Sequence, residues 1–424
     1  MEGIFMDERI QQLVEETKEK FGLDDYYLQR HRLEQHVNIL GETNYFLSME
    51  WFPSHADEQA EDELNPDGAA IVEINVHNGR TESIIFVGGI TYANRISFST
   101  SNEMISYIER ETGLMQKEDF DVHTEDSTGV YVIGSHNGIP IYPRASIELK
   151  VDRKGHLIQF SKLGYFPKKS MFLDEPYQLS LDKITDYIRQ QITRVDWPNY
   201  ETEEMHEMYG IEEIFIRNDQ SKTLPFEVIE FPQSYVPIDL QMDWSEPIEE
   251  EFDRQEIDWS EEILTEDAFA RTPSPDEQEI TKEEVATCTE AVRTFLRKVY
   301  GNEQREWMLT LFSRERGYIQ AQLRKNETNH RMFARKLVVF IDAETYEAVN
   351  YMDNELMIKA MDAFKQPDSV KYSMEDAYKM LYDHTELTPY YVYDKEKNYY
   401  VLCGKLDCQY GVHAHSGELM HMED

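Results

Sequence analysis

Capping patterns ahead of apolar periodic segments predict five helices along the chain. Three starts pair a capping Thr or Ser with an acid three residues later, which satisfies backbone N–H groups of the first helical turn. They are Thr100 with Glu103, Thr281 with Glu284 and Ser373 with Asp376. Asp7 and Ser180 are two weaker starts, and Ser180 predicts a helix through Ile184, Ile188 and Ile192. The five starts recur at intervals of 80 to 101 residues, which indicates a repeated unit.

Alternating apolar and polar segments follow these helices and predict antiparallel hairpins. Several end at a glycine, which accepts the positive φ of a tight turn. The clearest are 71–76 before Gly79, 147–151 before Gly155, 337–341 before Thr345 and 412–414 before Gly417. The third interval has no clear hairpin.

These elements together predict an α+β fold of about five diverged repeats, each a helix packed on a small antiparallel β-sheet. The predicted boundaries are repeat 1 at 1–97, repeat 2 at 98–172, a diverged repeat 3 at 173–242, an acidic linker at 243–279, repeat 4 at 280–365 and repeat 5 at 366–424. The linker would divide the chain into two halves.

The segment 281–351 resembles a PepSY domain, because a capped helix precedes a strand that runs into the polar hairpin Ile341-Asp342-Ala343-Glu344-Thr345. The helix-first period is similar to the related YcdB/YcdC repeat of Gram-positive bacteria. This resemblance implies units of one helix on a small antiparallel sheet. PepSY domains are associated with peptidase propeptides and inhibition and carry no catalytic residues, so the resemblance implies no active site.

The charge balance is strongly acidic, with 83 acidic and 42 basic residues and a net charge of -41. Such a field disfavours binding to DNA, RNA or an anionic membrane, and a basic protein or peptide, a cation or no charged partner is more natural. The simpler interpretation is that the charge keeps the protein soluble. The N-terminus has no basic and apolar signal pattern, and no apolar stretch is long enough to span a bilayer. Three cysteines are too few for a disulfide framework, so we expect a cytoplasmic protein.

The predicted linker at 243–279 holds 15 acids against two arginines and repeats the sequence Asp-Trp-Ser-Glu around Trp244 and Trp259. One interpretation is an acidic and aromatic arm in which Trp244 and Trp259 bind a partner. The other is a solvated tether whose tryptophans pack on neighbouring modules. Its charge density predicts that proteases cut it in the native protein.

A metal site is the main chemical hypothesis, and it rests on Cys403, Cys408, His413 and His415 near the C-terminus. Thiolates and imidazoles are zinc ligands, although this spacing matches no standard zinc finger or ribbon. Buried cysteines and edge histidines are the alternative. The segment around His206 lacks the second histidine of a zinc-peptidase helix. No catalytic or cofactor-binding residues are predicted.

The function that these observations favour is that of a non-enzymatic binding or scaffold protein that captures a peptide or protein partner. An exposed sheet edge would bind an extended peptide by strand addition. Two alternatives remain open: a metal-dependent enzyme that uses the C-terminal Cys/His cluster, and an acidic mimic of nucleic acid that binds a basic protein.

Overall fold

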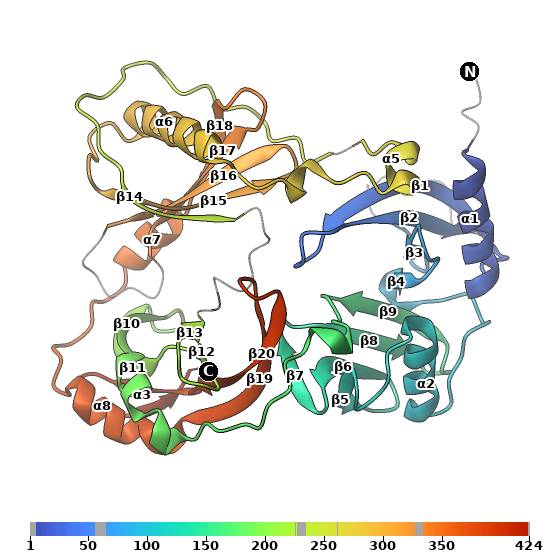
Figure 1. Ribbon diagram of the computed structural model, residues 1–424, viewed down its shortest axis with the longest axis horizontal. Helices are drawn as coiled ribbons and strands as arrows, with labels where there is room; N and C mark the ends of the chain where they lie inside the picture. The colour runs from blue at the N-terminus through green and yellow to red at the C-terminus, as the bar shows by residue number, and fades with distance from the viewer. Residues whose placement is uncertain are drawn as a thin grey trace. The chain divides into compact units, whose positions relative to one another are not determined.

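The computed structural model describes residues 6–55, 65–224, 226, 235–260, 262–326 and 334–422. The chain has a mixed α+β fold, mostly of sheets with a few helices, and forms two compact units (Figure 1). Unit 1 comprises Met1–Glu175, Glu261–Ser274 and Tyr390–Leu402. Unit 2 comprises Pro176–Ser260, Pro275–Pro389 and Cys403–Asp424.

Unit 1 is built on one largely antiparallel sheet with two helices against it, α1 (Glu8–Phe21) and α2 (Ser101–Thr112). In spatial order its strands are β1 (Tyr26–Val37), β2 (Thr43–Pro53), β3 (Ala70–Asn75), β4 (Thr81–Phe86), β9 (Leu157–Leu163), β8 (Ser146–Val151), β6 (Gly129–His136) and β7 (Ile139–Tyr142), while β5 (Phe120–Glu125) pairs with β6. Alternate residues of these strands bury apolar side chains under the helices in one core. The short helix α5 (Thr265–Ala270) adds Ala268 to the same core.

One part of unit 2 is a five-stranded antiparallel sheet covered by the long helix α6 (Lys282–Val299) (Figure 1). Its order is β14 (Val236–Gln241), β15 (Trp307–Glu315), β16 (Tyr318–Lys325), β17 (Lys336–Asp342) and β18 (Ala348–Asp353). Cys288, Val292 and Phe295 of α6 are fully or almost fully buried against the sheet. This α6 module, residues 236–353, therefore has its own apolar core.

The rest of unit 2 has a second core under the short helices α3 (Thr185–Gln190) and α8 (Met374–Leu381). Its four-stranded sheet has the order β10 (Ile192–Asn199), β11 (Glu204–Ile211), β21 (Tyr410–His413) and β22 (Leu419–His421). The other elements are β12 (Ile214–Arg217), β13 (Thr223–Leu224), α7 (Glu355–Asp362), β19 (Glu386–Asp394) and β20 (Tyr399–Asp407). The tip of the β19–β20 hairpin belongs to unit 1.

Four of the five predicted helix starts are confirmed. The side chains of Asp7, Thr100, Thr281 and Ser373 each accept a backbone N–H in the first turn of their helix. The prediction at Ser180 is wrong in detail, because that residue starts a short 3-10 turn and caps no helix with its side chain. Helix α3 begins later, and Ile192 lies in β10. The four predicted hairpins are confirmed as β3–β4, β8–β9, β17–β18 and β21–β22.

The organisation into five repeats is not confirmed, because strands from different predicted repeats share sheets. Strand β4 of predicted repeat 1 pairs with β9 of repeat 2, and their residues lie in one core. Strand β11 of predicted repeat 3 pairs with β21 of repeat 5. Strand β14, placed in predicted repeat 3, extends the sheet of the α6 module. Pairing between edges has joined the predicted small sheets into larger ones.

Much of the predicted acidic linker is packed against the α6 module, and we name residues 243–260 the wrapping segment. It begins with Trp244 in the core, where the indole N–H donates to the Gly301 carbonyl at 3.0 Å. Phe252 packs edge-on against Phe295 of α6, with ring centroids 4.9 Å apart. The backbone N–H of Gln255 then donates to the Val349 carbonyl at 2.9 Å, which covers part of the outer edge of β18. The segment therefore crosses from one edge of the sheet to the other.

Basic residues of the α6 module bind the wrapping segment. Arg305 donates to Asp243 at 2.9 Å and Lys298 lies 2.6 Å from Glu250. Arg293 and Arg297 of α6 donate to the backbone carbonyls of Asp243 and Glu246. Some of the acids that suggested a solvated linker are therefore partners of a basic helix face.

A buried ion pair fixes the start of α6 to its sheet. Glu284 completes the capping box with Thr281 and also accepts from Arg314 of β15 at 2.6 Å and from the Tyr346 hydroxyl at 3.1 Å. Burial opposes the ionised form of Glu284, but these hydrogen bonds outweigh it and lower the pKa of the carboxyl to about 2. The Arg314 residue is itself only 8% exposed. The opposite charges of Glu284 and Arg314 therefore compensate each other inside the protein.

None of the helices in the described ranges combines the length and the low charge needed to cross a lipid bilayer.

Replacing Glu284 by Gln should make the free energy of unfolding depend less on pH under acidic conditions. Because the pKa of Glu284 falls from an unfolded value near 4.5 to about 2 in the folded state, its contribution is complete above pH 5 and is lost as the pH falls towards 2. We expect Glu284→Gln to lower the free energy of unfolding by about 3 kcal/mol at pH 7 and by much less near pH 2. Urea titrations across this pH range measure it, with the exposed neighbour substitution Glu283→Gln as control. Equal losses at both pH values would contradict the assignment.

The packing of the wrapping segment predicts slow cleavage where the charge density alone predicted fast cleavage. Trypsin should cut slowly after Arg254, because its guanidinium donates to the Tyr351 carbonyl at 2.8 Å and its neighbour Phe252 is packed. Phe252→Ala should speed this cut several-fold without speeding the cut after Lys397, which lies in an exposed turn. Mass spectrometry of timed digests measures both. Fast cleavage after Arg254 in the unaltered protein would show that the segment is not held.

Candidate functional site

The structure does not bring the four predicted metal ligands together. Cys403 is fully buried in β20, and Cys408 follows that strand with its thiol near the Tyr410 carbonyl at 3.5 Å. Burial raises the pKa of the Cys408 thiol, which disfavours the thiolate that zinc needs. Within the described ranges, no three donor atoms that include Cys403, Cys408, His413 or His415 lie within 4.8 Å of one another.

Hydrogen bonds occupy the nitrogens of the two predicted histidine ligands. Nδ1 of His413 accepts the backbone N–H groups of His415 and Ser416 at 3.2 and 3.3 Å. Nε2 therefore carries the proton and donates to Nδ1 of His206, 3.2 Å away in β11. His415 donates from Nδ1 to the Ser369 carbonyl and accepts the Lys371 ammonium at Nε2, both at 2.8 Å. A metal bound to Nε2 of His413 would need a proton on Nδ1, facing two N–H groups, so this geometry does not favour metal binding there.

The two tryptophans predicted to bind a partner lie in different environments. Trp244 is 6% exposed and fills the core of the α6 module. Trp259 is 43% exposed and packs edge-on against Tyr318 and Phe340, with ring centroids 6.0 and 5.7 Å apart. Trp244 is therefore a core residue in this structure, and Trp259 alone presents its ring to solvent. A role for Trp259 in partner binding stays a prediction.

An Asp–His pair in unit 1 resembles part of a catalytic site but lacks a nucleophile. His136 is buried, its ring stacks on Phe172 at 3.9 Å, and its Nε2 lies 2.9 Å from Asp174. Tyr391 donates its hydroxyl to the same Asp174 oxygen at 3.0 Å. The hydrogen-bond partners of the His136 ring in the described chain are Asp174 and Asn137, and neither is a nucleophile of acyl transfer. The arrangement anchors the 172–174 loop.

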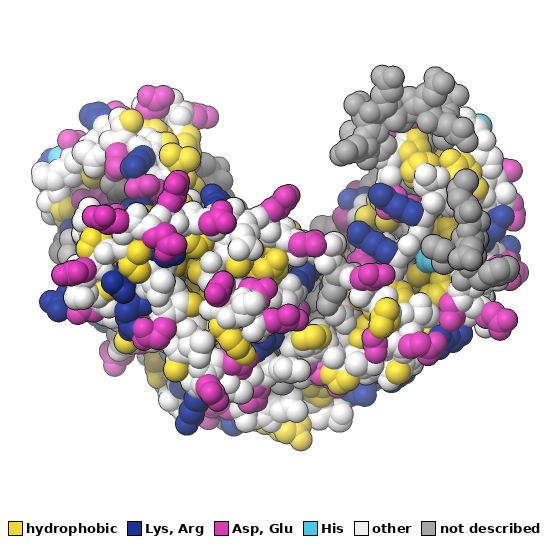
Figure 2. All heavy atoms as spheres, turned by 90° about the horizontal axis from the view of Figure 1, so that it is seen from above, with side chains coloured by type: hydrophobic (Ala, Val, Ile, Leu, Met, Phe, Trp, Pro, Cys, Tyr) yellow, Lys and Arg dark blue, Asp and Glu magenta, His cyan; other side chains and the backbone are white. Residues whose placement is uncertain are grey.

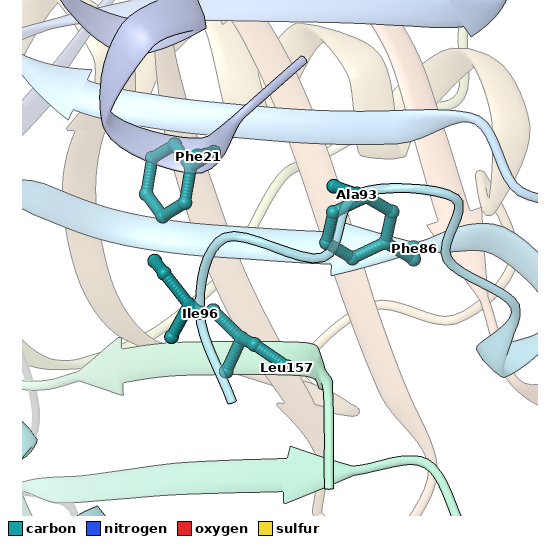
Figure 3. A pocket seen from close by; sticks show the side chains of 5 residues that line it. All are labelled: Phe21, Phe86, Ala93, Ile96 and Leu157. Carbon is teal, nitrogen blue, oxygen red and sulfur yellow. The ribbon is translucent and has the colours of Figure 1, made fainter. Parts of the chain in front are cut away.

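A small pocket between α1, β4, β9 and the loop before α2 is lined by apolar side chains. Its lining is Phe21, Phe86, Ala93, Ile96 and Leu157 (Figure 3). A cofactor or substrate site needs a few convergent polar groups to orient its ligand, and these side chains offer none. The pocket is therefore a packing gap in the core of unit 1.

Strand β1 is the candidate functional element that sequence reasoning missed. It is 12 residues long and lies at the end of its sheet, where β2 is its pairing partner among the described strands. Residues 29–32 are exposed on both faces, and Arg30 and Arg32 have side chains 67% and 75% exposed. The signal in the sequence was the mixture of Arg, His and Gln with Tyr, Leu and Val, which is typical of a charged edge strand.

A cluster of one histidine and two glutamates lies on the solvent face of the sheet beside this strand. Nε2 of His36 is 3.8 Å from a carboxylate oxygen of Glu34 and 3.8 Å from one of Glu73. Glu34 and His36 are two residues apart on β1 and so share a face, while Glu73 reaches them from β3. Arg32 binds the other oxygen of Glu34 at 2.6 Å. Among the described residues, this is the group of three His, Cys, Asp or Glu side chains whose possible metal-ligand atoms all lie within 4.8 Å of one another.

The electrostatics of the cluster differ between its two acids. The nearby His36 imidazole, together with Arg32, lowers the pKa of Glu34 although burial opposes the shift. Burial, with the negative charge of Glu34, raises the pKa of Glu73. The two carboxylates therefore repel each other in a half-buried site, and a positive charge between them lowers that energy.

Acidic side chains are not gathered in one patch on the face that Figure 2 shows. Asp and Glu are spread over it and are interspersed with Lys and Arg. A protein that imitates nucleic acid would present a continuous row of negative charge. The described residues on this face form no such row.

The similarity of this chain to known structures is weak. No protein-family model matches the chain, and no curated protein matches it. The solved structure of the Bacillus megaterium YpeB C-terminal domain aligns with 82% of this chain and 97% of its own length, at a TM-score of 0.23 and 8% identity. A likeness of this size carries no argument about function. No family is therefore assigned to the chain.

The hydrogen-bonded histidine pair predicts a shifted titration of His413. Burial, followed by the nearby His206 and His415, lowers the pKa of His413 below its usual value of 6.5. The neutral ring therefore stabilises the fold at pH 7, and this contribution is lost as the pH falls through the folded pKa. NMR titration of the histidine ring protons should place the midpoint of His413 below the usual value of 6.5, and His206→Ala should move it upward. A midpoint at or above 6.5 would contradict the pair.

Proposed function

We propose that this protein is a non-enzymatic binding protein that captures an extended peptide by adding it as a strand to the outer edge of β1. The observation that supports the proposal is the edge strand itself. It exceeds the usual strand length of about 5–6 residues twofold, and its middle residues are exposed on both faces. A strand of this kind offers a row of backbone donors and acceptors to another chain.

The regular part of β1 is long enough to hold a peptide. A bulge interrupts the register between Leu28 and Arg30, and pairing with β2 then continues without a break to Val37. Alternate N–H and C=O groups of this stretch point away from β2, as in any edge strand. Strand addition along it would supply affinity through the backbone, while side-chain pairs on the two faces would supply specificity.

The side chains along the edge favour an acidic peptide. Arg30 and Arg32 are largely exposed, and each also pairs with an acid of the sheet: Arg30 with Glu50, and Arg32 with Glu34, the one acid of the strand. Cross-strand neighbours lie about 5 Å apart, so Glu or Asp at alternate positions of an added strand would pair with the two arginines. The net charge of -41 favours a basic partner over longer distances, and that prediction remains. At β1 itself the contact chemistry favours acids.

The PepSY resemblance supports the same class of function. The α6 module is a capped helix on an antiparallel sheet and contains the segment 281–351. We propose that it is a PepSY-like unit, that the chain is a binding or scaffold protein of the same kind, and that it acts in the cytoplasm. The metal-dependent enzyme is less favoured, because the C-terminal histidines are occupied by hydrogen bonds.

Hydrogen exchange with a model peptide tests the proposal. The probe is a ten-residue peptide of alternating Glu and Val, and a peptide of alternating Lys and Val is its counterpart. We expect the acidic peptide to slow exchange of β1 amides within 29–37 and to leave α6 unchanged. The double substitution Arg30→Glu, Arg32→Glu should weaken binding at least ~10-fold.

The matched control is Lys150→Glu, because Lys150 lies on the same face of the same sheet but in an interior strand. The Lys150→Glu variant should bind the acidic peptide as tightly as the unaltered protein does. Protection of β1 by neither peptide would reject strand addition, and protection by the lysine peptide alone would reject the acidic preference. Protection of β1 that rises with protein concentration alone would identify a second copy of the chain as the occupant.

A further inference from the structure

The cluster of Glu34, His36 and Glu73 has the donor set and the spacing of a metal site. It offers one imidazole nitrogen and two carboxylate oxygens, with the nitrogen 3.8 Å from each oxygen. Ligands of a tetrahedral zinc ion at ~2.0–2.2 Å from the metal lie about 3.3 Å apart. An ion would need to bring the nitrogen and each oxygen closer by about half an ångström, and the two oxygens, which lie within 4.8 Å of each other, closer by at most about 1.5 Å. Side-chain rotation can supply movements of this size.

The sheet positions the three ligands by strand register. Arg32, Ser48 and Glu73 lie in one row across β1, β2 and β3. Ser48 is small, so Glu73 can reach across β2 towards the side chains of β1. Glu34 lies in the next row, opposite Phe46, and the His36 ring packs against Phe46 with centroids 5.5 Å apart. Phe46 is 9% exposed and forms an apolar floor beneath the cluster.

A neighbouring residue already orients one ligand. Arg32 holds Oε1 of Glu34 at 2.6 Å, while Oε2 of the same carboxylate faces His36. Metal sites commonly use such an outer partner to fix a ligand. The His36 side chain is 51% exposed, so an ion and its waters can enter from solvent.

We propose that Glu34, His36 and Glu73 bind a divalent transition-metal ion of the zinc type, with solvent completing the coordination. Two carboxylates that repel each other across a histidine gain a central positive charge on binding. The simpler alternative is that protonated His36 alone bridges the two acids. If the cluster is a metal site, it should bind added metal near neutral pH. If His36 alone bridges the two acids, it should not.

Titration with metal alone tests the site, without any peptide. Zinc chloride should bind the metal-free protein at pH 7.5 in isothermal titration calorimetry, and cobalt(II) should give a visible absorption band of low coordination number. His36→Asn and Glu73→Gln should each weaken this binding at least ~100-fold, because each removes a direct ligand. Both positions are on the solvent side of the sheet, and circular dichroism checks that the variants fold.

His31→Asn and Glu148→Gln are the matched controls. His31 lies on the same strand with its side chain on the other face, and Glu148 lies in the same row as Glu73 but on β8. Both should keep the binding and the cobalt band. No binding by the unaltered protein, or binding that survives in both His36→Asn and Glu73→Gln, would overturn the proposal. Because no peptide is present, failure here leaves the strand-addition result unaffected.

Discussion

Unpaired strand edges are the constraint on which this structure depends. Every strand at the end of a sheet exposes a row of backbone donors and acceptors that must meet water or another chain. In unit 1, β4 and β9 pair and so merge two hairpins into one sheet. In unit 2, β11 pairs with β21, β14 pairs with β15, and the wrapping segment contacts the edge of β18. Strand β1 has β2 as its pairing partner among the described strands, and its residues 29–32 are exposed, which is the observation that the proposed strand addition uses.

Charged residues of this protein form local ion pairs within the fold, in addition to giving it a large net charge. The wrapping segment places acids and backbone carbonyls against Arg293, Arg297 and Lys298 of one helix. Within the same module, Arg335 is 6% exposed and binds Asp353 at 2.9 Å, and Tyr300 also donates its hydroxyl to Asp353. Buried arginines of this kind need their acids, since removal of one partner leaves an uncompensated charge. Some of the excess acidic residues therefore neutralise basic side chains that are packed within the fold.

Local features could be predicted from the sequence, whereas long-range pairing could not. Thr281 with Glu284 and Ser373 with Asp376 are capping boxes because both halves of the pattern lie within one turn. The turn glycines likewise placed β3–β4 and β8–β9. Which edge pairs with which depends on contacts between residues far apart in the chain, so the shared sheets were not visible. The candidate cluster was missed for the same reason, because Glu73 joins Glu34 and His36 only through the register of three strands.

The discontinuity of unit 1 affects how the chain acquires its structure during synthesis. Its core takes Ala268 from α5, and its last segment is Tyr390–Leu402, in which Tyr391 pairs with Ile141 of β7. A ribosome that has made the first 175 residues has therefore not yet supplied every part of this unit. Contacts over more than 200 residues of chain form late and slowly. Until β19 emerges, β7 has β6 as a partner but lacks β19, so its other edge stays open to non-native pairing.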